Sequence, residues 1–104
     1  MSNFVCKEKT IARAAFDAIV HGHVQHVGFR YYACAEAESL GISGWIRNNP
    51  GGEVEIRAEG ETGKLKKFLL WLNKGPPHGR VDSVNVHWRE AQGTYKGFVV
   101  DYDL

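Results

Sequence analysis

The sequence predicts an α+β domain in which two helices cover one face of an antiparallel sheet. Three observations support this fold class. Two segments carry apolar residues at helical spacing, the other apolar segments alternate with a period of two, and turns rich in glycine or proline separate them. The 104 residues suffice for one hydrophobic core, and 43% apolar with 24% charged residues is typical of a globular protein. We therefore expect one domain over residues 14–104.

The first expected strand covers Phe16–His21, where apolar and polar positions alternate. Before it, residues 1–13 contain no uninterrupted apolar stretch, so a flexible N-terminal tail is expected there rather than a signal peptide. A loop at 22–27 leads into the first expected helix, which ends near Gly41. The apolar residues at helical spacing are Phe29, Ala33, Ala37 and Leu40.

Two more strands are expected at Ile42–Asn48 and Glu53–Glu59, joined by a turn at 49–52. In Glu53–Glu59 the glutamates alternate with apolar residues, which predicts that they lie on a solvated face of the sheet. The second helix is predicted from the i, i+3, i+4, i+7 spacing of its leucines and phenylalanine, with Thr62 as N-cap and Gly75 near its end. Those apolar residues are Leu65, Phe68, Leu69 and Leu72.

A fourth strand is predicted where Val84, Val86 and Trp88 alternate, and a short fifth near the C-terminus at Phe98–Tyr102. The resulting order is that of a ferredoxin-like βαββαβ sandwich with an added C-terminal strand. This fold carries metal carriers, RNA binders and enzymes alike, so function has to be argued from a site.

Charge and cysteine content narrow the classes of function. The net charge is only +1, so no broad basic surface is expected to attract nucleic acid or an anionic membrane. Cys6 and Cys34 lack the spacing of a zinc or redox motif and are expected to be free thiols. No segment approaches a membrane span, so we expect a cytoplasmic protein. A monomer is expected as well. The histidines at 21, 23 and 26 cluster without an acidic or thiol neighbour, so solvated side chains are favoured and no metal site or cofactor is expected.

The loop Gly22–Arg30 is the most informative segment, because it connects a strand directly to a helix N-terminus. A helix start leaves backbone N–H groups without intrahelical partners and carries a partial positive charge, which favours phosphate. Arg30 in the first turn adds a planar guanidinium that can engage two phosphate oxygens. These features predict a local dianion site.

Asn48 ends the second expected strand and could project its amide beside this loop. An amide donates and accepts hydrogen bonds, so it could hold a water molecule in line with a bound phosphorus, although it cannot act as a base. On spacing alone, the favoured interpretation is that Asn48 and Asn49 are merely turn residues before Pro50.

Two motifs resemble those of one family. Residues 22–30 read Gly-His-Val-Gln-His-Val-Gly-Phe-Arg, and residues 44–48 read Gly-Trp-Ile-Arg-Asn. They are similar to the Gly-x-Val-Gln-x-Val-x-Phe-Arg and Gly-Trp-Val-x-Asn motifs of the acylphosphatase family. Further similarity in the second helix, Arg80 and the terminal Phe98 extends the resemblance from about Phe16 to Tyr102.

This resemblance implies a metal-independent hydrolase that splits small acyl phosphates into carboxylate and inorganic phosphate. It implies that Arg30 binds the phosphate and that Asn48 orients the water, while the substrate's own phosphate helps to deprotonate that water. It also implies a phosphate-binding loop, whose residues are Val24, Gln25, His26, Val27, Gly28 and Phe29.

One position departs from the family pattern, because His26 stands where glycine is usual. Glycine in an anion-binding loop often serves a positive φ, and a Cβ there costs about 1–2 kcal/mol. We therefore expect a strained loop, and we expect His26→Gly to raise turnover.

Two alternatives remain at this level. Residues 96–102 loosely resemble the aromatic signature of RNA-binding modules of this fold, but they lie on the last strand rather than the third. The second alternative is a non-catalytic domain that binds phosphate or carbamoyl phosphate through the same loop.

Overall fold

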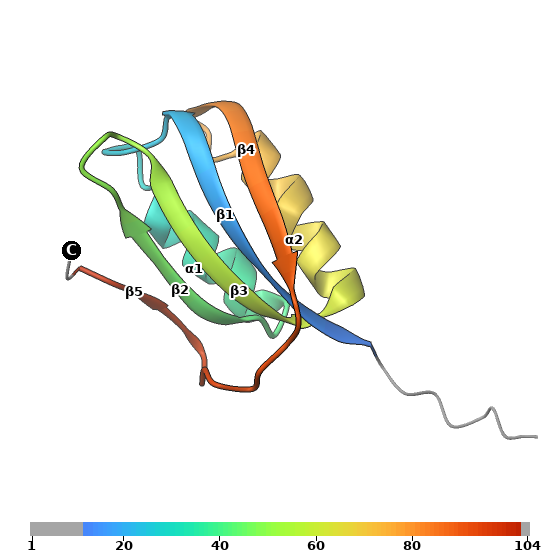
Figure 1. The fold of residues 1–104 in the computed structure, drawn as a ribbon. Helices are drawn as coiled ribbons and strands as arrows, with labels where there is room; N and C mark the ends of the chain where they lie inside the picture. The colour runs from blue at the N-terminus through green and yellow to red at the C-terminus, as the bar shows by residue number, and fades with distance from the viewer. Residues whose placement is uncertain (1–11, 103–104) are drawn as a thin grey trace, which may run out of the picture.

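Two helices pack on one face of a five-stranded sheet in the computed structural model, which describes residues 12–102 (Figure 1). The elements in chain order are β1 (Arg13–His23), α1 (Phe29–Ser39), β2 (Ser43–Asn48), β3 (Val54–Glu61), α2 (Thr62–Lys74), β4 (Arg80–Arg89) and β5 (Phe98–Val100). This order confirms the predicted ferredoxin-like sandwich with its fifth strand.

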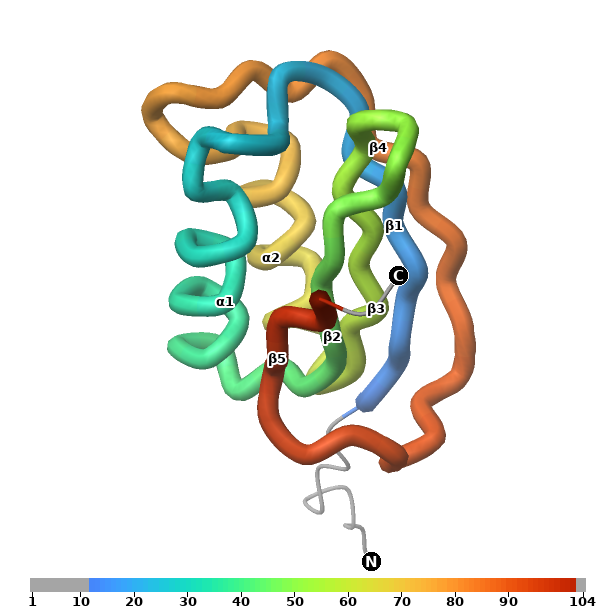
Figure 2. The backbone as a smooth tube through the Cα atoms, turned by 90° about the vertical axis from the view of Figure 1, so that its left-hand side faces the viewer, coloured from blue at the N-terminus to red at the C-terminus, as the bar shows by residue number. Residues whose placement is uncertain are grey.

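The sheet is mixed rather than wholly antiparallel. Its strand order is β4-β1-β3-β2-β5, and the first four of these strands pair antiparallel. Strand β5 instead runs parallel to β2, with Gly44 opposite Phe98. The reason is topological: β4 ends at the end of the sheet where β2 begins, and the following segment crosses to the opposite edge there (Figure 2). The prediction of an antiparallel sheet is therefore wrong at this edge alone.

Several boundaries differ from their predicted positions. Strand β1 is longer than predicted at both ends. It includes Arg13, which pairs with Glu61, so the predicted tail of residues 1–13 is wrong at this residue. The rest of the expected tail, residues 1–11 with Cys6, lies outside the described residues. The N-cap of α2 is Glu61 rather than Thr62, because β3 continues directly into the helix and Thr62 is already its first residue.

The core lies between the helices and the sheet. Helix α1 buries Phe29, Ala33 and Ala37. Of the four apolar positions predicted in α2, Leu65, Phe68 and Leu72 are buried and Leu69 is half-buried. Phe16 and Phe68 meet with ring centroids 6.3 Å apart, which ties β1 to α2. Burying side chains of this size contributes about 1.5–3 kcal/mol each, so the two helices are held to the sheet chiefly by apolar contact.

Glu59 contradicts the expectation that the β3 glutamates are solvated. It is only 3% exposed, because Gln92 and Gly93, in the segment between β4 and β5, lie against its carboxylate on the face away from the helices. Its carboxylate accepts hydrogen bonds from the backbone N–H groups of Gln92, at 3.0 Å, and of Gly93. A buried carboxylate requires such donors, and alternation alone could not reveal them.

Within residues 12–102, neither helix has the length and apolar character needed to cross a membrane.

Candidate active site

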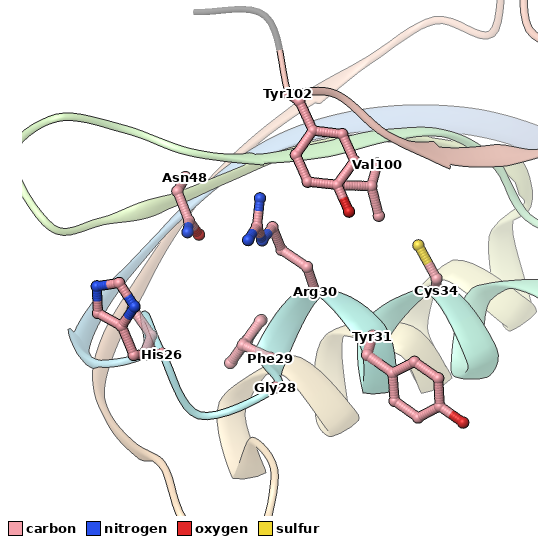
Figure 3. A pocket seen from close by; sticks show the side chains of 10 residues that line it. His26, Gly28, Phe29, Arg30, Tyr31, Cys34, Asn48, Val100 and Tyr102 are labelled. Carbon is pink, nitrogen blue, oxygen red and sulfur yellow. The ribbon is translucent and has the colours of Figure 1, made fainter.

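A pocket of about 300 Å³ opens where the loop after β1, the first turns of α1, the end of β2 and the segment after β5 converge (Figure 3). The residues that line it are Val24, His26, Gly28, Phe29, Arg30, Tyr31, Cys34, Asn48, Val100 and Tyr102. Three separate stretches of the sequence thus share one cavity, and both residues with a predicted catalytic role are among the lining residues.

Helix α1 starts at the floor of this pocket. Its N-cap is Gly28, whose φ of 78° is left-handed and whose lack of a side chain leaves the first turn uncapped. The first helical hydrogen bond runs from the Tyr32 N–H to the Gly28 carbonyl at 3.0 Å. The N–H groups ahead of Tyr32 have no intrahelical acceptor, so they are available to an anion in the pocket.

Arg30 extends from the first turn of α1 into the pocket, and its guanidinium points toward the space beside Asn48 (Figure 3). The Tyr102 ring lies against it, with the guanidinium carbon 5.1 Å from the ring centroid. A planar guanidinium stacks well on an aromatic ring while its edge donors stay available. The C-terminal segment therefore helps to fix the direction in which Arg30 presents its donors.

Asn48 faces Arg30 across the same pocket (Figure 3). It is the last residue of β2 and pairs with Val54, so the sheet fixes its backbone. Its side-chain oxygen is buried and has no hydrogen-bond partner among residues 12–102. Since buried polar atoms are nearly always hydrogen-bonded, this oxygen is suited to bind a donor that enters the pocket, such as a water molecule.

His26 lines the pocket with a left-handed backbone. Its φ is 66°, and it is the one residue other than glycine with a positive φ in the described part of the chain. Its side chain is exposed. The loop therefore adopts the conformation that glycine would favour, at a cost of about 1–2 kcal/mol for a residue with a Cβ.

Two residues predicted in the phosphate-binding loop do not line the pocket. Val27 packs against the core. Gln25 turns its side chain to the hairpin between β2 and β3, where its Nε2 donates to the carbonyls of Asn49 at 2.8 Å and Glu53 at 2.9 Å. Gln25 thus ties the loop to the strand that carries Asn48, a role that the sequence did not reveal.

The sequence prediction missed four lining residues. Tyr31 and Cys34 lie on α1, and Cys34 follows Arg30 by four residues, so helical spacing could have identified it. Val100 and Tyr102 come from the far end of the chain, and only the parallel pairing of β5 with β2 brings them here. Burial raises the pKa of the Cys34 thiol, Glu38 raises it further, and Arg30 partly opposes this, so the thiol is uncharged near neutral pH.

Fold and pocket together define a small ferredoxin-like protein with a polar pocket at the N-terminus of its first helix. The acylphosphatase family profile matches residues 16–100, which is most of the chain. The chain belongs to the acylphosphatase family, whose members are hydrolases.

Individual relatives agree with this assignment. The acylphosphatase of Acaryochloris marina is 39% identical over 96% of this chain and 97% of its own length. Among solved structures, the acylphosphatase from Bacillus subtilis superposes with a TM-score of 0.83 at 34% identity, covering 86% of this chain and 99% of that one. A full-length HypF in its phosphate- and nucleotide-bound form is also similar, with a TM-score of 0.81 at 26% identity, but the match covers 92% of this chain and only 13% of HypF.

Proposed function

We propose that this chain hydrolyses small acyl phosphates, with Arg30 and the N-terminus of α1 binding the phosphate and Asn48 orienting the attacking water. The observation that supports this most directly is the shared pocket, in which the guanidinium and the buried amide oxygen face one another (Figure 3). A phosphate between them would meet donors from the helix and Arg30 on one side and a held water on the other.

The proposed hydrolysis needs no further catalytic group from the protein. The water oxygen forms a bond to phosphorus while the bond between phosphorus and the carboxyl oxygen breaks, and the carboxylate leaves with the electron pair. One water proton passes to a phosphate oxygen and then to solvent. Because a carboxylate is a good leaving group, positioning and charge stabilisation suffice, which is what an arginine, a helix start and an amide provide.

We further propose that the enzyme works without a metal ion or cofactor, as a monomer in the cytoplasm, and without nucleic acid. The positive charge that the reaction requires is already supplied by Arg30 and the helix dipole. The substrate is the acyl phosphate and the products are the carboxylate and inorganic phosphate. We also retain the proposal that the catalytic domain covers residues 14–104.

The test is turnover of acetyl phosphate and of benzoyl phosphate in the presence of a chelator, beside p-nitrophenyl phosphate as a stable ester. We expect hydrolysis of both anhydrides and not of the ester. Arg30→Lys and Asn48→Ala should each lower kcat by about 100-fold or more, because each removes an oriented group from the transition state. Arg80→Lys and Asn85→Ala, at exposed positions on β4, are the matched controls and should retain activity.

The second candidate is a non-catalytic domain that binds phosphate or carbamoyl phosphate through the same loop. HypF, which resembles this chain over one segment, was solved in a phosphate-bound form. Binding of inorganic phosphate by the wild type without turnover of any anhydride would support that candidate and reject the hydrolase. Binding of single-stranded RNA that weakens steeply with salt would instead support the RNA-binding alternative.

A further inference from the structure

The pocket has two ends of different chemistry, separated by Arg30 (Figure 3). His26, Asn48 and the start of α1 form the polar end. On the other side of Arg30 lie Cys34 and Val100, with the Tyr102 ring beside them. If the polar end holds the phosphate and water, this second end is where the rest of the substrate must lie.

The backbone fixes the distance between these two ends. Cys34 is one helical turn beyond Arg30 on the same face of α1, about 6 Å farther from the helix N-terminus. Val100 pairs with Ile46, two residues before Asn48 on β2, so it is also displaced along the sheet away from the amide. Both layers of the fold thus place the second end beyond the phosphate position, by one helical turn on α1 and by two residues on β2.

The second end is uncharged and mostly apolar, and the Tyr102 hydroxyl is its one strongly polar side-chain group (Figure 3). The Cys34 thiol is half-buried and carries no charge near neutral pH, and Val100 adds an aliphatic wall. None of the ten lining residues is an aspartate, glutamate or lysine, so the one permanent charge of the pocket is Arg30. An acyl group with its own carboxylate would lose water here, and no second cationic side chain lines the pocket to compensate, because the phosphate already occupies Arg30.

The volume of the pocket limits how much of an acyl group it can cover. About 300 Å³ corresponds to roughly ten non-hydrogen atoms, at about 30 Å³ for each water molecule in the liquid. A phosphate with its four oxygens uses about half of that space. The remainder fits an acyl group of roughly four or five carbons, whereas an acetyl group would leave part of it unfilled.

We propose that Cys34, Val100 and Tyr102 form an acyl subsite that selects uncharged, apolar acyl groups of about four or five carbons. The proposal rests on the hydrolase function argued above. It assigns substrate preference to α1 and the C-terminal segment, and it leaves phosphate binding to the loop and Arg30.

The test compares the kcat/KM values of acetyl, 3-methylbutanoyl and malonyl phosphate. Each rate is corrected for the spontaneous hydrolysis of the compound. The last two have the same number of non-hydrogen atoms in the acyl group and differ in an isopropyl group against a carboxylate. We expect kcat/KM for 3-methylbutanoyl phosphate to exceed that for acetyl phosphate by about fivefold, from partial burial of three added carbons. We expect it to exceed that for malonyl phosphate by about tenfold or more.

Cys34→Lys provides the decisive variant, because loss of folding cannot produce a new preference. An ammonium group at this position should raise the ratio of kcat/KM for malonyl over 3-methylbutanoyl phosphate at least tenfold. Ala35→Lys adds the same charge at the neighbouring exposed position, outside the pocket, and should leave that ratio unchanged.

The outcomes separate the two proposals. If none of the three compounds is hydrolysed, the hydrolase function itself fails. If all three are hydrolysed with equal kcat/KM, or if Ala35→Lys shifts the ratio as much as Cys34→Lys, the hydrolase function stands and the acyl subsite is rejected.

Discussion

The proposed chemistry depends on single residues that leave polar atoms in the pocket free to bind a ligand. The Asn48 amide oxygen is buried without a partner among residues 12–102, and Gly28 leaves the first turn of α1 uncapped. Both features cost stability, since buried polar atoms are normally satisfied. Their concentration in one pocket is typical of a site that completes its hydrogen bonds with a ligand.

His26→Gly is expected to raise kcat for acetyl phosphate. The φ of 66° is unfavourable for a residue with a Cβ, so glycine should let the loop N–H groups align with the phosphate without that strain. Stability should change by less than about 1 kcal/mol, because relief of strain is offset by the greater entropy of glycine in the unfolded chain. The measurements are steady-state kinetics and urea denaturation.

His26→Ala is the control for this prediction, because it removes the imidazole and keeps the Cβ. If alanine raises kcat as much as glycine does, the imidazole rather than the backbone is responsible. Unchanged or lower turnover in the glycine variant would reject the strained loop.

At the scale of elements, the sequence predicted the order of strands and helices because the apolar periodicity of each segment is local. It also indicated Arg30 and Asn48, since both lie within short motifs at predicted element ends. It could not indicate the roles of Gln25 or Tyr102. Each depends on a partner far away along the chain, and such contacts arise only when the sheet has been assembled.

Gln25 is expected to be a positioning residue that acts through the loop. Gln25→Met keeps the side-chain length but removes both donors to the hairpin carbonyls, which should cost about 1–2 kcal/mol of stability. It should also lower kcat about tenfold, because small misplacements of an anion-binding loop are costly. A purely structural role would lower stability while leaving kcat and inhibition by inorganic phosphate at wild-type values.

Gly44 is expected to tolerate no side chain, because β2 passes very close to β3 at this point. A Cβ there would lie 1.9 Å from the carbonyl oxygen of Arg57, and φ is 139°. Gly44→Ala should destabilise the protein by more than about 3 kcal/mol, measured by urea denaturation. Gly52→Ala has a φ of 100° but no atom within 4 Å of the added Cβ, so it isolates backbone strain and should cost less. Equal losses would show that the close approach is unimportant.

At the scale of the whole molecule, polar contacts connect the strands and the β4–β5 segment on the sheet face that the helices do not cover. Glu59 fixes the segment that leads to β5, and through it the position of Val100 and Tyr102 in the pocket. Local periodicity placed this glutamate in solvent, since a pattern of alternation reports which face a residue occupies but not what covers that face. The parallel pairing of β5 with β2 could not be predicted for a related reason. It depends on the end of the sheet at which β4 finishes, which local periodicity does not report.

Asp17 joins three strands on this same face, because its carboxylate on β1 accepts hydrogen bonds from Arg57 on β3 and Arg89 on β4. Burial alone would raise the pKa of Asp17, but the two guanidinium groups outweigh it and hold the pKa below its ordinary value of about 3.9. A depressed pKa means that folding favours the ionised form. The stabilisation is therefore complete above about pH 4 and is lost as pH falls through the lowered value.

Asp17→Asn should consequently lower the free energy of unfolding by about 1 kcal/mol at pH 7, the size expected for two partly exposed ion pairs. The difference from wild type should shrink below about pH 4, as the wild-type carboxylate also becomes neutral. Urea denaturation at a series of pH values measures both effects. Asp82→Asn, which breaks a more exposed pair with Arg80, is the control and should have a smaller effect. A gap between Asp17→Asn and wild type that stayed constant down to pH 2 would show that the loss comes from packing, because only the ionised carboxylate can hold the three strands through charge.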